Sequence, residues 1–481
     1  MTCNKLFSSI LFILITLSTS AKVPVYYNVG TSGIMSSGET APFWLHSNRN
    51  GMYSASPYSS VTFIEIGKDL QQEKKLFKYG FKANGQLRFD DHGTKFYLQE
   101  MYVKLRLGAF DLNIGSREEH LGNQQPVLSS GGFLFSNNAR PIPKIMIGIE
   151  EFTAIPFTHG YAEIKGGISH GWLNGEAYVK NAFLHHKYAY LRLGGKLPVN
   201  IQYGFEHAAQ WGGTHPTLGK QAIGFDDFMR VFFGKEGSSS SNPNEIYNAL
   251  GNHLISQSIR LDFKFAGYVL SGYWQNLNED GPIKFIWDSM NRPDGLFGIS
   301  FQNNNFPYLS GILYEYLNTT DQSGPFHDKD GIVYGGKDNY FGNNIYQSGW
   351  SYFANSIGTP FITPPYKKED GKYADYSNRT KVHHIGIQGD IFGYKYRILN
   401  SFSKNYGTYN NPFNKVMKCN SLLVEVNKTF PKLLGIEIGC ALAADFGTLP
   451  VVDGGVIKNG GNTFGALITI RKKDILFNLP W

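Results

Sequence analysis

Residues 258–265 read Ser258-Ile259-Arg260-Leu261-Asp262-Phe263-Lys264-Phe265, a strict alternation of polar and apolar side chains. In a β-strand, successive side chains point to opposite faces, so the four apolar residues share one face. The other face carries three consecutive charges, which a dry protein core does not tolerate. The apolar face is stable against lipid, and the charged face is stable against water. The stretch is therefore typical of a strand in a membrane β-barrel.

The alternation breaks at Ala266-Gly267 and then resumes, which predicts a hairpin between antiparallel strands. Four more predicted turns also carry a phenylalanine, at residues 108–111, 304–307, 390–393 and 429–432. The stretches between the hairpins are longer and rich in Gly, Asn, Ser and Asp. Bacterial barrels have short periplasmic turns and long extracellular loops. We therefore expect the phenylalanine turns at the periplasmic rim and the long loops at the cell surface.

The chain divides into three predicted parts. Residues 1–21 are expected to be an export signal, because Lys5 precedes an apolar stretch and small residues end at Ala21. Residues 22–58 show no sustained alternation, and we expect an irregular periplasmic or plug-like segment there. Residues 59–481 are expected to form one all-β, antiparallel transmembrane barrel of the outer membrane. A hairpin unit of about 45 residues divides the mature chain into about 16–20 strands.

Composition narrows the range of partners. The chain has 45 Lys and Arg against 38 Asp and Glu, a formal net charge of +7. The charges are scattered, so they favour an acidic glycan or lipopolysaccharide only weakly. No basic stripe or nucleic-acid-binding motif occurs, and no nucleic-acid partner is expected. Aromatic residues make up 15% of the chain and fit both membrane-interface girdles and stacking on sugars, so they do not discriminate.

Two cysteines follow the predicted export signal, Cys419 and Cys440. The apolar alternation around them points Cys419 into the lumen and Cys440 outward. A disulfide requires both sulfur atoms on one side of the sheet. We therefore expect two free thiols.

No catalytic residue, cofactor or metal site is expected. The string Gly167-Ile168-Ser169-His170-Gly171 matches the nucleophile elbow of hydrolases, but strand-like residues flank it where that motif requires a strand-to-helix turn. The pairs His185-His186 and His383-His384 do not fit one metal ion, because neighbours in a strand point to opposite faces. The chain is therefore expected not to be an enzyme.

Several short motifs are distinctive in their order along the chain. They lie at residues 41–49, 136–143, 204–213, 273–275, 294–295, 321–325, 338–341 and 349–350. In this order they resemble the Wzi family of capsule-assembly outer-membrane proteins, in the form found in Bacteroides-like bacteria. The resemblance implies a barrel of about eighteen strands. It also implies a lectin-like, non-catalytic protein that anchors or helps to assemble capsular or other surface polysaccharide.

Further partners and alternatives follow from these features. Outer-membrane lipid or lipopolysaccharide would surround the barrel, and the barrel-assembly machinery would read the closing strand, whose terminal Trp481 is similar to its recognition signal. Three alternatives remain open. They are a porin or transport barrel with an open lumen, an outer-membrane barrel hydrolase, and a secreted soluble β-sandwich.

The candidate glycan-binding residues lie where long loops begin or run. Aromatic rings stack on sugar faces, and amide or carboxylate groups hydrogen-bond to hydroxyls. The preferred surface cluster is Asp338, Asn339, Tyr340 and Trp350, with ordinary loop packing as the alternative. His207 and Trp211 form a second candidate pair, for which packing at the barrel rim is the favoured interpretation.

Two further groups are expected to be mainly structural. Trp44, His46 and Arg49 lie in the plug-like segment and are expected to pin it to the barrel, with ligand binding from the plug as the alternative. Asn137, Asn138 and Arg140 precede a Pro-Ile-Pro run and are expected to shape an inward loop through side-chain to backbone hydrogen bonds.

Overall fold

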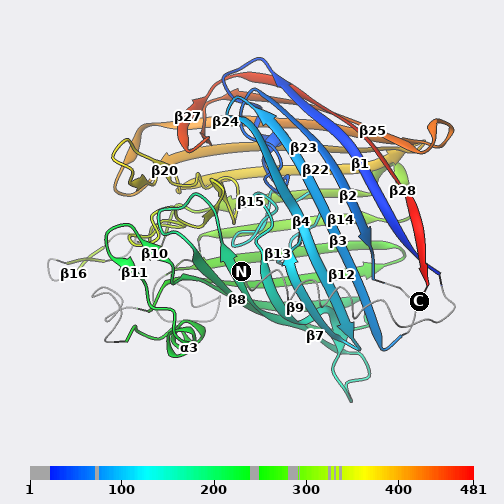
Figure 1. Cartoon of the computed structure of the whole chain (residues 1–481), viewed down its shortest axis with the longest axis horizontal. Coiled ribbons are helices and arrows are strands. Elements are labelled where there is room, and N and C mark those ends of the chain that lie inside the picture. The colour runs from blue at the N-terminus through cyan, green and yellow to red at the C-terminus, as the bar shows by residue number, and fades with distance from the viewer. Residues whose placement is uncertain are drawn as a thin grey trace.

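The computed structural model describes residues 22–70, 75–238, 249–279, 291, 293–322, 327–329, 332–334 and 338–480. Within these residues, one antiparallel sheet of 18 strands closes on itself into a barrel (Figure 1). This confirms the predicted fold and strand number. The predicted export signal and Trp481 lie outside the described residues.

The barrel strands follow one another around the sheet in chain order, and β28 pairs with β1 to close it. They are β1 (Lys22–Ser36), β2 (Tyr58–Lys68), β3 (Phe77–Asp90), β4 (Gly93–Leu107), β5 (Phe110–Ser116), β6 (Lys144–Ala154), β7 (Ala162–Leu173), β8 (Ala182–Leu193), β9 (Val199–Trp211), β12 (Asn252–Phe265), β13 (Tyr268–Asn278), β14 (Gly295–Asn303), β15 (Gly311–Asn318), β22 (Thr380–Ile391), β23 (Tyr394–Gly407), β24 (Pro412–Phe430), β25 (Ile436–Gly447) and β28 (Thr463–Pro480).

The loops carry short elements of their own. The small hairpins are β10 (Thr214–His215) with β11 (Gly219–Lys220), β16 (His327–Lys329) with β17 (Ile332–Tyr334), β18 (Ser351–Tyr352) with β19 (Asn355–Ser356), β20 (Tyr366–Lys367) with β21 (Tyr373–Ala374), and β26 (Leu449–Asp453) with β27 (Val456–Gly460). The helices within the described residues are α2 (Phe43–His46) and α3 (Phe225–Phe233), with 3₁₀ turns η2 (Pro307–Leu309) and η3 (Pro431–Leu433). No helix in the described parts of the chain is long and apolar enough to cross a membrane.

The structure corrects the predicted start of the barrel. Residues Lys22–Ser36 are not irregular but form β1, in which Val29 lies opposite Ile64 of β2 and Lys472 of β28. The residues Gly30-Thr31-Ser32-Gly33 interrupt the apolar alternation of this strand, so no strand is predicted there. Its backbone is hydrogen-bonded on both sides because it closes the sheet. Residues 37–57 follow as an irregular segment that contains only α2.

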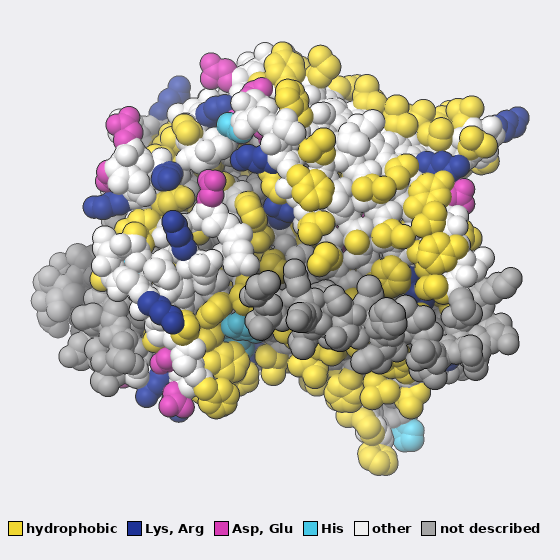
Figure 2. Space-filling view, viewed as in Figure 1, with side chains coloured by type: hydrophobic (Ala, Val, Ile, Leu, Met, Phe, Trp, Pro, Cys, Tyr) yellow, Lys and Arg dark blue, Asp and Glu magenta, His cyan; other side chains and the backbone are white. Residues whose placement is uncertain are grey.

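The two faces of the wall are those that the alternation predicts. On β12, Leu261 and Phe263 are exposed on the outside, whereas Asp262 on the lumen side is 6% exposed. Arg260 reaches the same carboxylate over 2.8 Å. Figure 2 shows hydrophobic side chains spread over the outer wall formed by β1–β4 and β28, with many charged groups nearer one end. Cys419 is buried, Cys440 is exposed and both thiols are free, as expected.

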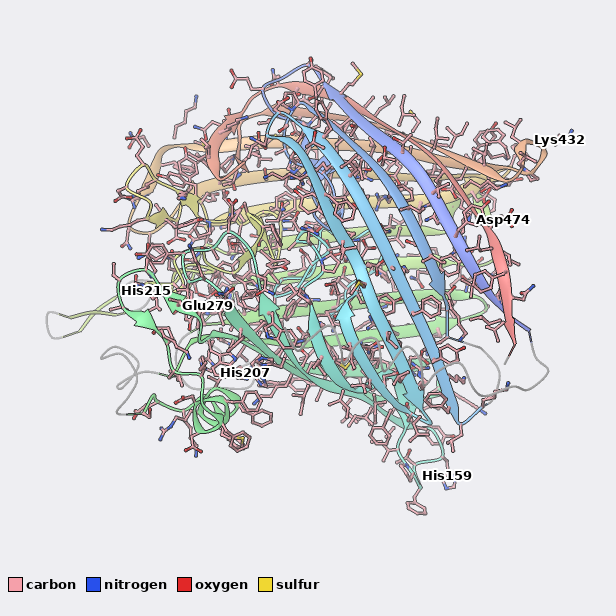
Figure 3. All side chains as sticks on the ribbon, in the orientation of Figure 1. His159, His207, His215, Glu279, Lys432 and Asp474 are labelled. Carbon is pink, nitrogen blue, oxygen red and sulfur yellow. The ribbon has the colours of Figure 1, made fainter. Side chains whose placement is uncertain are left out.

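The two ends of the barrel differ. All five phenylalanine turns are hairpins between neighbouring strands, and antiparallel topology places all five at one end. We call it the turn end, and it also holds Lys22 and Pro480. The opposite loop end carries the long connections, together with two short ones between β3 and β4 and between β23 and β24. Figure 3 places Lys432 and Asp474 towards the turn end and His215 and Glu279 towards the loop end.

Three segments between barrel strands enter the lumen, and we call them the plug segments: residues 37–57, 117–143 and 338–365. Each is held by inward side chains of the wall. Asp445 of β25 accepts a hydrogen bond from the backbone N–H of Phe43 at 2.8 Å, and Gln275 of β13 accepts one from Phe133 at 2.9 Å. Gln210 of β9 donates to the carbonyl oxygen of Gly349 at 3.0 Å. Most of the buried apolar residues lie between these segments and the inner wall.

Candidate functional site

A cavity of about 560 Å³ lies on the loop-end side of the plug segments, and we call it the outer cavity. Its walls come from parts of the chain that are far apart in sequence: the plug segments, the β3–β4 hairpin, the β20–β21 region and the β26–β27 hairpin. The lining residues that matter below are His46, Arg88, His92, Lys95, Tyr97, Asn138, Arg140, Glu176, Phe353, Lys367, Lys368, Glu369 and Asp453.

Arg140 is the most strongly organised cation of this cavity. Its guanidinium lies 4.0 Å from the ring centroid of Tyr97 and 4.7 Å from that of Phe353. It also donates a hydrogen bond to the carbonyl oxygen of Leu98 at 3.2 Å. Burial lowers the pKa of Arg140, but a guanidinium stays charged in proteins. The arrangement is a fixed cation between two rings at a cavity wall.

Phe353 occupies an unusual backbone position. Phe353 and Ala354 form the two-residue turn between β18 and β19, with φ values of 49° and 60°. Hairpin turns with two positive φ values usually hold Asn-Gly, because side chains such as phenylalanine strain the backbone there. Such strain persists where the surrounding structure enforces it, and it occurs often at ligand sites. Here it presents the Phe353 ring to Arg140.

The β26–β27 hairpin is tied to the cavity rim through Asp453. This carboxylate accepts hydrogen bonds from His92 at 2.9 Å, from Lys458 at 2.8 Å and from Ser56 at 3.3 Å. Burial alone would raise the pKa of Asp453, but its partners Lys458 and His92 outweigh burial and hold that pKa below its usual value. Asp453 therefore holds the β26–β27 hairpin at the cavity rim through its hydrogen bonds with protein groups.

The outer cavity carries a surplus of unpaired positive charge. Arg88 pairs with Asp90 at 2.9 Å. Within the residues that the structure describes, no ion pair joins Arg140, Lys95, Lys367 or Lys368 to a carboxylate, and Glu176 and Glu369 are likewise unpaired. Four free cations thus face two free carboxylates. A ligand with carboxylate or phosphate groups would offset the difference.

His46 adds a neutral polar group to the same wall. Burial lowers its pKa to about 4, and the nearby charge of Arg49 acts in the same direction. Among the described residues its Nε2 atom has no hydrogen-bond partner. At neutral pH the uncharged imidazole has one donor and one acceptor nitrogen, which suits a sugar hydroxyl.

The preferred surface cluster of the sequence analysis is not at the surface. Tyr340 and Trp350 are each 1% exposed, and the Trp350 Nε1–H donates to the carbonyl oxygen of Leu134 at 2.8 Å. Asn339 donates to Asp375 and accepts from Asn378, both at 2.6 Å. Asp338 is 5% exposed. The expectation of surface exposure is corrected: the loop turns inward and packs its aromatic rings inside the plug, because burying them removes a large apolar area from water.

His207 and Trp211 lie elsewhere, on the outward face of β9. Both are nearly buried. Helix α3 covers Trp211 from outside the barrel, and His207 lies against two other histidines, His185 and His253. The Trp211 and Phe228 rings are 5.9 Å apart, and the ring of His207 is stacked on that of His253 at 5.0 Å. The pair therefore does not line the outer cavity.

Trp44 and Arg49 fasten the first plug segment. Arg49 donates to Glu425 of β24 at 2.8 Å and to the carbonyl oxygen of Trp44 at 3.1 Å. The Trp44 ring lies 5.3 Å from that of His384 on β22. These contacts join residues 37–57 to two strands of the wall.

Asn137 and Asn138 join plug segments to one another. Asn137 donates to the side chain of Asn50 at 3.1 Å, and Asn138 donates to the carbonyl oxygen of Ser356 at 3.2 Å. Arg140, expected to be structural as well, instead lines the outer cavity. Sequence reasoning missed Tyr97, Phe353 and the free lysines, because nothing local marks them as neighbours of Arg140.

A second cavity of about 290 Å³ lies nearer the turn end and is lined largely by charges. Three of its four lysine and arginine side chains are paired: Arg117 contacts Glu119 at 3.2 Å and also Glu150, Lys144 contacts Glu119 at 2.5 Å, and Lys104 contacts Glu150. The fourth, Lys165, lies over the rings of Phe152 and Tyr190. The cavity therefore offers less to a charged ligand than the outer cavity does.

Comparison with known proteins gives a family match. A family described as "Capsule assembly protein Wzi" matches residues 35–361. No curated protein matches the chain. Among solved structures, the chain is similar to Wzi of Escherichia coli, which is described as an outer-membrane protein involved in group 1 capsule assembly and a carbohydrate-binding β-barrel. The two are 12% identical, and the match covers 98% of this chain and 87% of the Escherichia coli chain, with a TM-score of 0.56. Pseudomonas aeruginosa OccK3 (OpdO) is 9% identical over 97% of this chain and 98% of its own, with a TM-score of 0.46.

Proposed function

The chain belongs to the Wzi family of capsule assembly proteins, and we propose that it holds surface polysaccharide in its outer cavity without catalysing a reaction. The observation that carries the proposal is the position of Arg140 between the rings of Tyr97 and Phe353, in a cavity with free cations. Rings stack on sugar faces, and guanidinium binds carboxylate or phosphate through paired hydrogen bonds. An acidic polysaccharide satisfies both kinds of group.

The orientation of the barrel supports this role. In bacterial outer membranes short turns face the periplasm and long loops face outward. The turn end with its phenylalanine hairpins is then periplasmic, and the outer cavity opens to the cell surface. Outer-membrane lipid and lipopolysaccharide surround the apolar wall, and the barrel-assembly machinery inserts the closed sheet.

The alternatives fit less well. A porin needs an open lumen, whereas three plug segments are anchored to the inner wall of this barrel. A hydrolase with its nucleophile at Ser169 needs a strand-to-helix turn, whereas Ser169 lies within β7 and is 3% exposed. Binding without turnover needs only the groups already assembled around Arg140.

The test in cells is capsule retention. A strain that lacks the protein is complemented with the wild type, with Arg140→Gln or with Lys432→Gln, which removes a charge at the opposite end of the barrel. We expect attached polysaccharide with the wild type and with Lys432→Gln, and released polysaccharide with Arg140→Gln at equal protein levels. Normal retention in the strain that lacks the protein would contradict the proposed function.

A further inference from the structure

A short helix lies against the outside of the barrel wall near the loop end. Helix α3 packs on β8 and β9 (Figure 1). Val231 is fully buried, and the Phe228 ring lies 5.6 Å from that of His185. His185 and His207 point away from the lumen. Polar groups are costly against hydrocarbon. The rings of Phe228 and Phe232 on α3 cover His185, and His207 is stacked on His253.

The surface of α3 has three sectors. One packs on the barrel, one is polar and faces water, and the third is apolar. Phe228, Val231 and Phe232 face the barrel, and Asp226 and Arg230 face away from it. Between them runs a stripe of three large apolar residues at i, i+4 and i+8: Phe225, Met229 and Phe233. Phe225 is 76% exposed and Phe233 is 59% exposed.

The stripe continues the apolar wall of the barrel. Val199 and Ile201 at the turn end of β9 are exposed on the same outer face. A tilted strand advances about 2.5 Å along the barrel axis per residue, so His207 lies about 20 Å above Val199. The apolar band of such barrels is about 25 Å tall. Helix α3 therefore lies at the boundary between hydrocarbon and headgroups on the loop-end side.

We propose that α3 is an interfacial helix, whose stripe of Phe225, Met229 and Phe233 is embedded among the acyl chains of the outer leaflet. An apolar sector beside a charged sector is what a helix lying in the membrane plane requires. Nine residues form a marginal helix in water, so α3 depends on having both apolar sectors covered. The barrel covers one of them, and lipid covers the other. The embedded helix fixes the height of the loop between β9 and β12 above the membrane.

Spin labels on the full-length protein in phosphatidylcholine vesicles test this. Labels at Phe225→Cys and Phe233→Cys, in a Cys440→Ser background, are compared with one at Asp226→Cys as the water-facing control. The native Cys440, exposed on the lipid face of β25, serves as the lipid reference. We expect the ratio of oxygen to nickel-chelate accessibility at 225 and 233 to be several-fold higher than at 226 and nearer to that at 440.

Two results would overturn the proposal. Ratios at 225 and 233 equal to that at 226 would place the stripe in water. Low accessibility to both reagents would show that a second protein copy covers it instead. Bimane fluorescence from the same cysteines gives a second readout, in which the emission at 225 and 233, but not at 226, is expected to shift to shorter wavelength.

Discussion

Arg49 of the first plug segment lies 2.8 Å from Glu425 of β24, and Arg397 of β23 approaches the same carboxylate oxygen at 3.1 Å. One acidic side chain thus joins the plug to two strands of the wall. Because the group is mostly buried, its loss would leave two cations with no compensating charge at this point.

Replacing Glu425 by alanine is therefore expected to loosen the plug by about 3 kcal/mol. Hydrogen exchange in residues 37–57 measures this local opening. Glu437→Ala is the matched control, since Glu437 pairs with the more exposed Arg471 and this pair is expected to contribute less than about 1 kcal/mol. Equal exchange in the two variants would show that the Arg49 contact does not hold the plug.

The plugged lumen predicts a nearly silent barrel in planar bilayers. The wild type is expected to give no large steady current, and Glu425→Ala is expected to give more frequent opening events because its plug is less firmly held. Large steady currents from the wild type would instead support a transport function.

The orientation is tested by labelling intact cells with a membrane-impermeant maleimide. Lys367→Cys, at the loop end, is expected to react, and Lys432→Cys, at the turn end, to react only after lysis. Cys419 is buried and Cys440 lies on the lipid face, so the native thiols give little background. Labelling at 432 but not at 367 in intact cells would reverse the assignment.

The hydrogen bonds of Asp453 to His92, Lys458 and Ser56 predict that the stability of the cavity rim depends on pH. The pKa of Asp453 is lower in the folded protein than its unfolded value of about 3.9. Its ionised form therefore stabilises the rim at any pH above about 3.9, and this contribution is lost as pH falls through the lower folded value. The protection of the β26–β27 amides against hydrogen exchange is expected to fall over that acid range in the wild type. Asp453→Asn should show fast exchange already at neutral pH, and a flat profile in both proteins would contradict the assignment.

Replacing Phe353 is expected to change the stability of the β18–β19 turn and the binding of polysaccharide in opposite directions. Phe353→Asn is expected to stabilise the β18–β19 turn by about 1 kcal/mol, because asparagine adopts positive φ more readily. The same change removes a ring from the outer cavity and is expected to weaken polysaccharide binding. Unchanged binding together with higher stability would show that Phe353 has no role in recognition.

The architecture was largely predictable because alternation along a strand reports which face meets lipid. The stretch around Leu261 and Asp262 carried that signal clearly. In β1 it failed, since Gly30 to Gly33 contribute no apolar side chains, and the strand exists because its partners β2 and β28 pair with it.

The candidate site was less predictable because it is assembled from distant loops. Tyr340 and Trp350 looked like surface aromatics but are buried, since nothing in a loop sequence tells whether the loop turns inward. For Arg140 the sequence predicts only a structural role. Its neighbours Tyr97 and Phe353 come from β4 and the β18–β19 turn, so only the folded barrel brings the three together.

The most direct test of the proposed function is binding of purified acidic capsular polysaccharide to the wild type, Arg140→Gln and Lys432→Gln in detergent, measured by calorimetry. We expect binding by the wild type and Lys432→Gln, weakened by added salt, and about a tenfold loss of affinity in Arg140→Gln. Equal affinity in all three proteins, or no binding by the wild type, would contradict the assignment of the outer cavity.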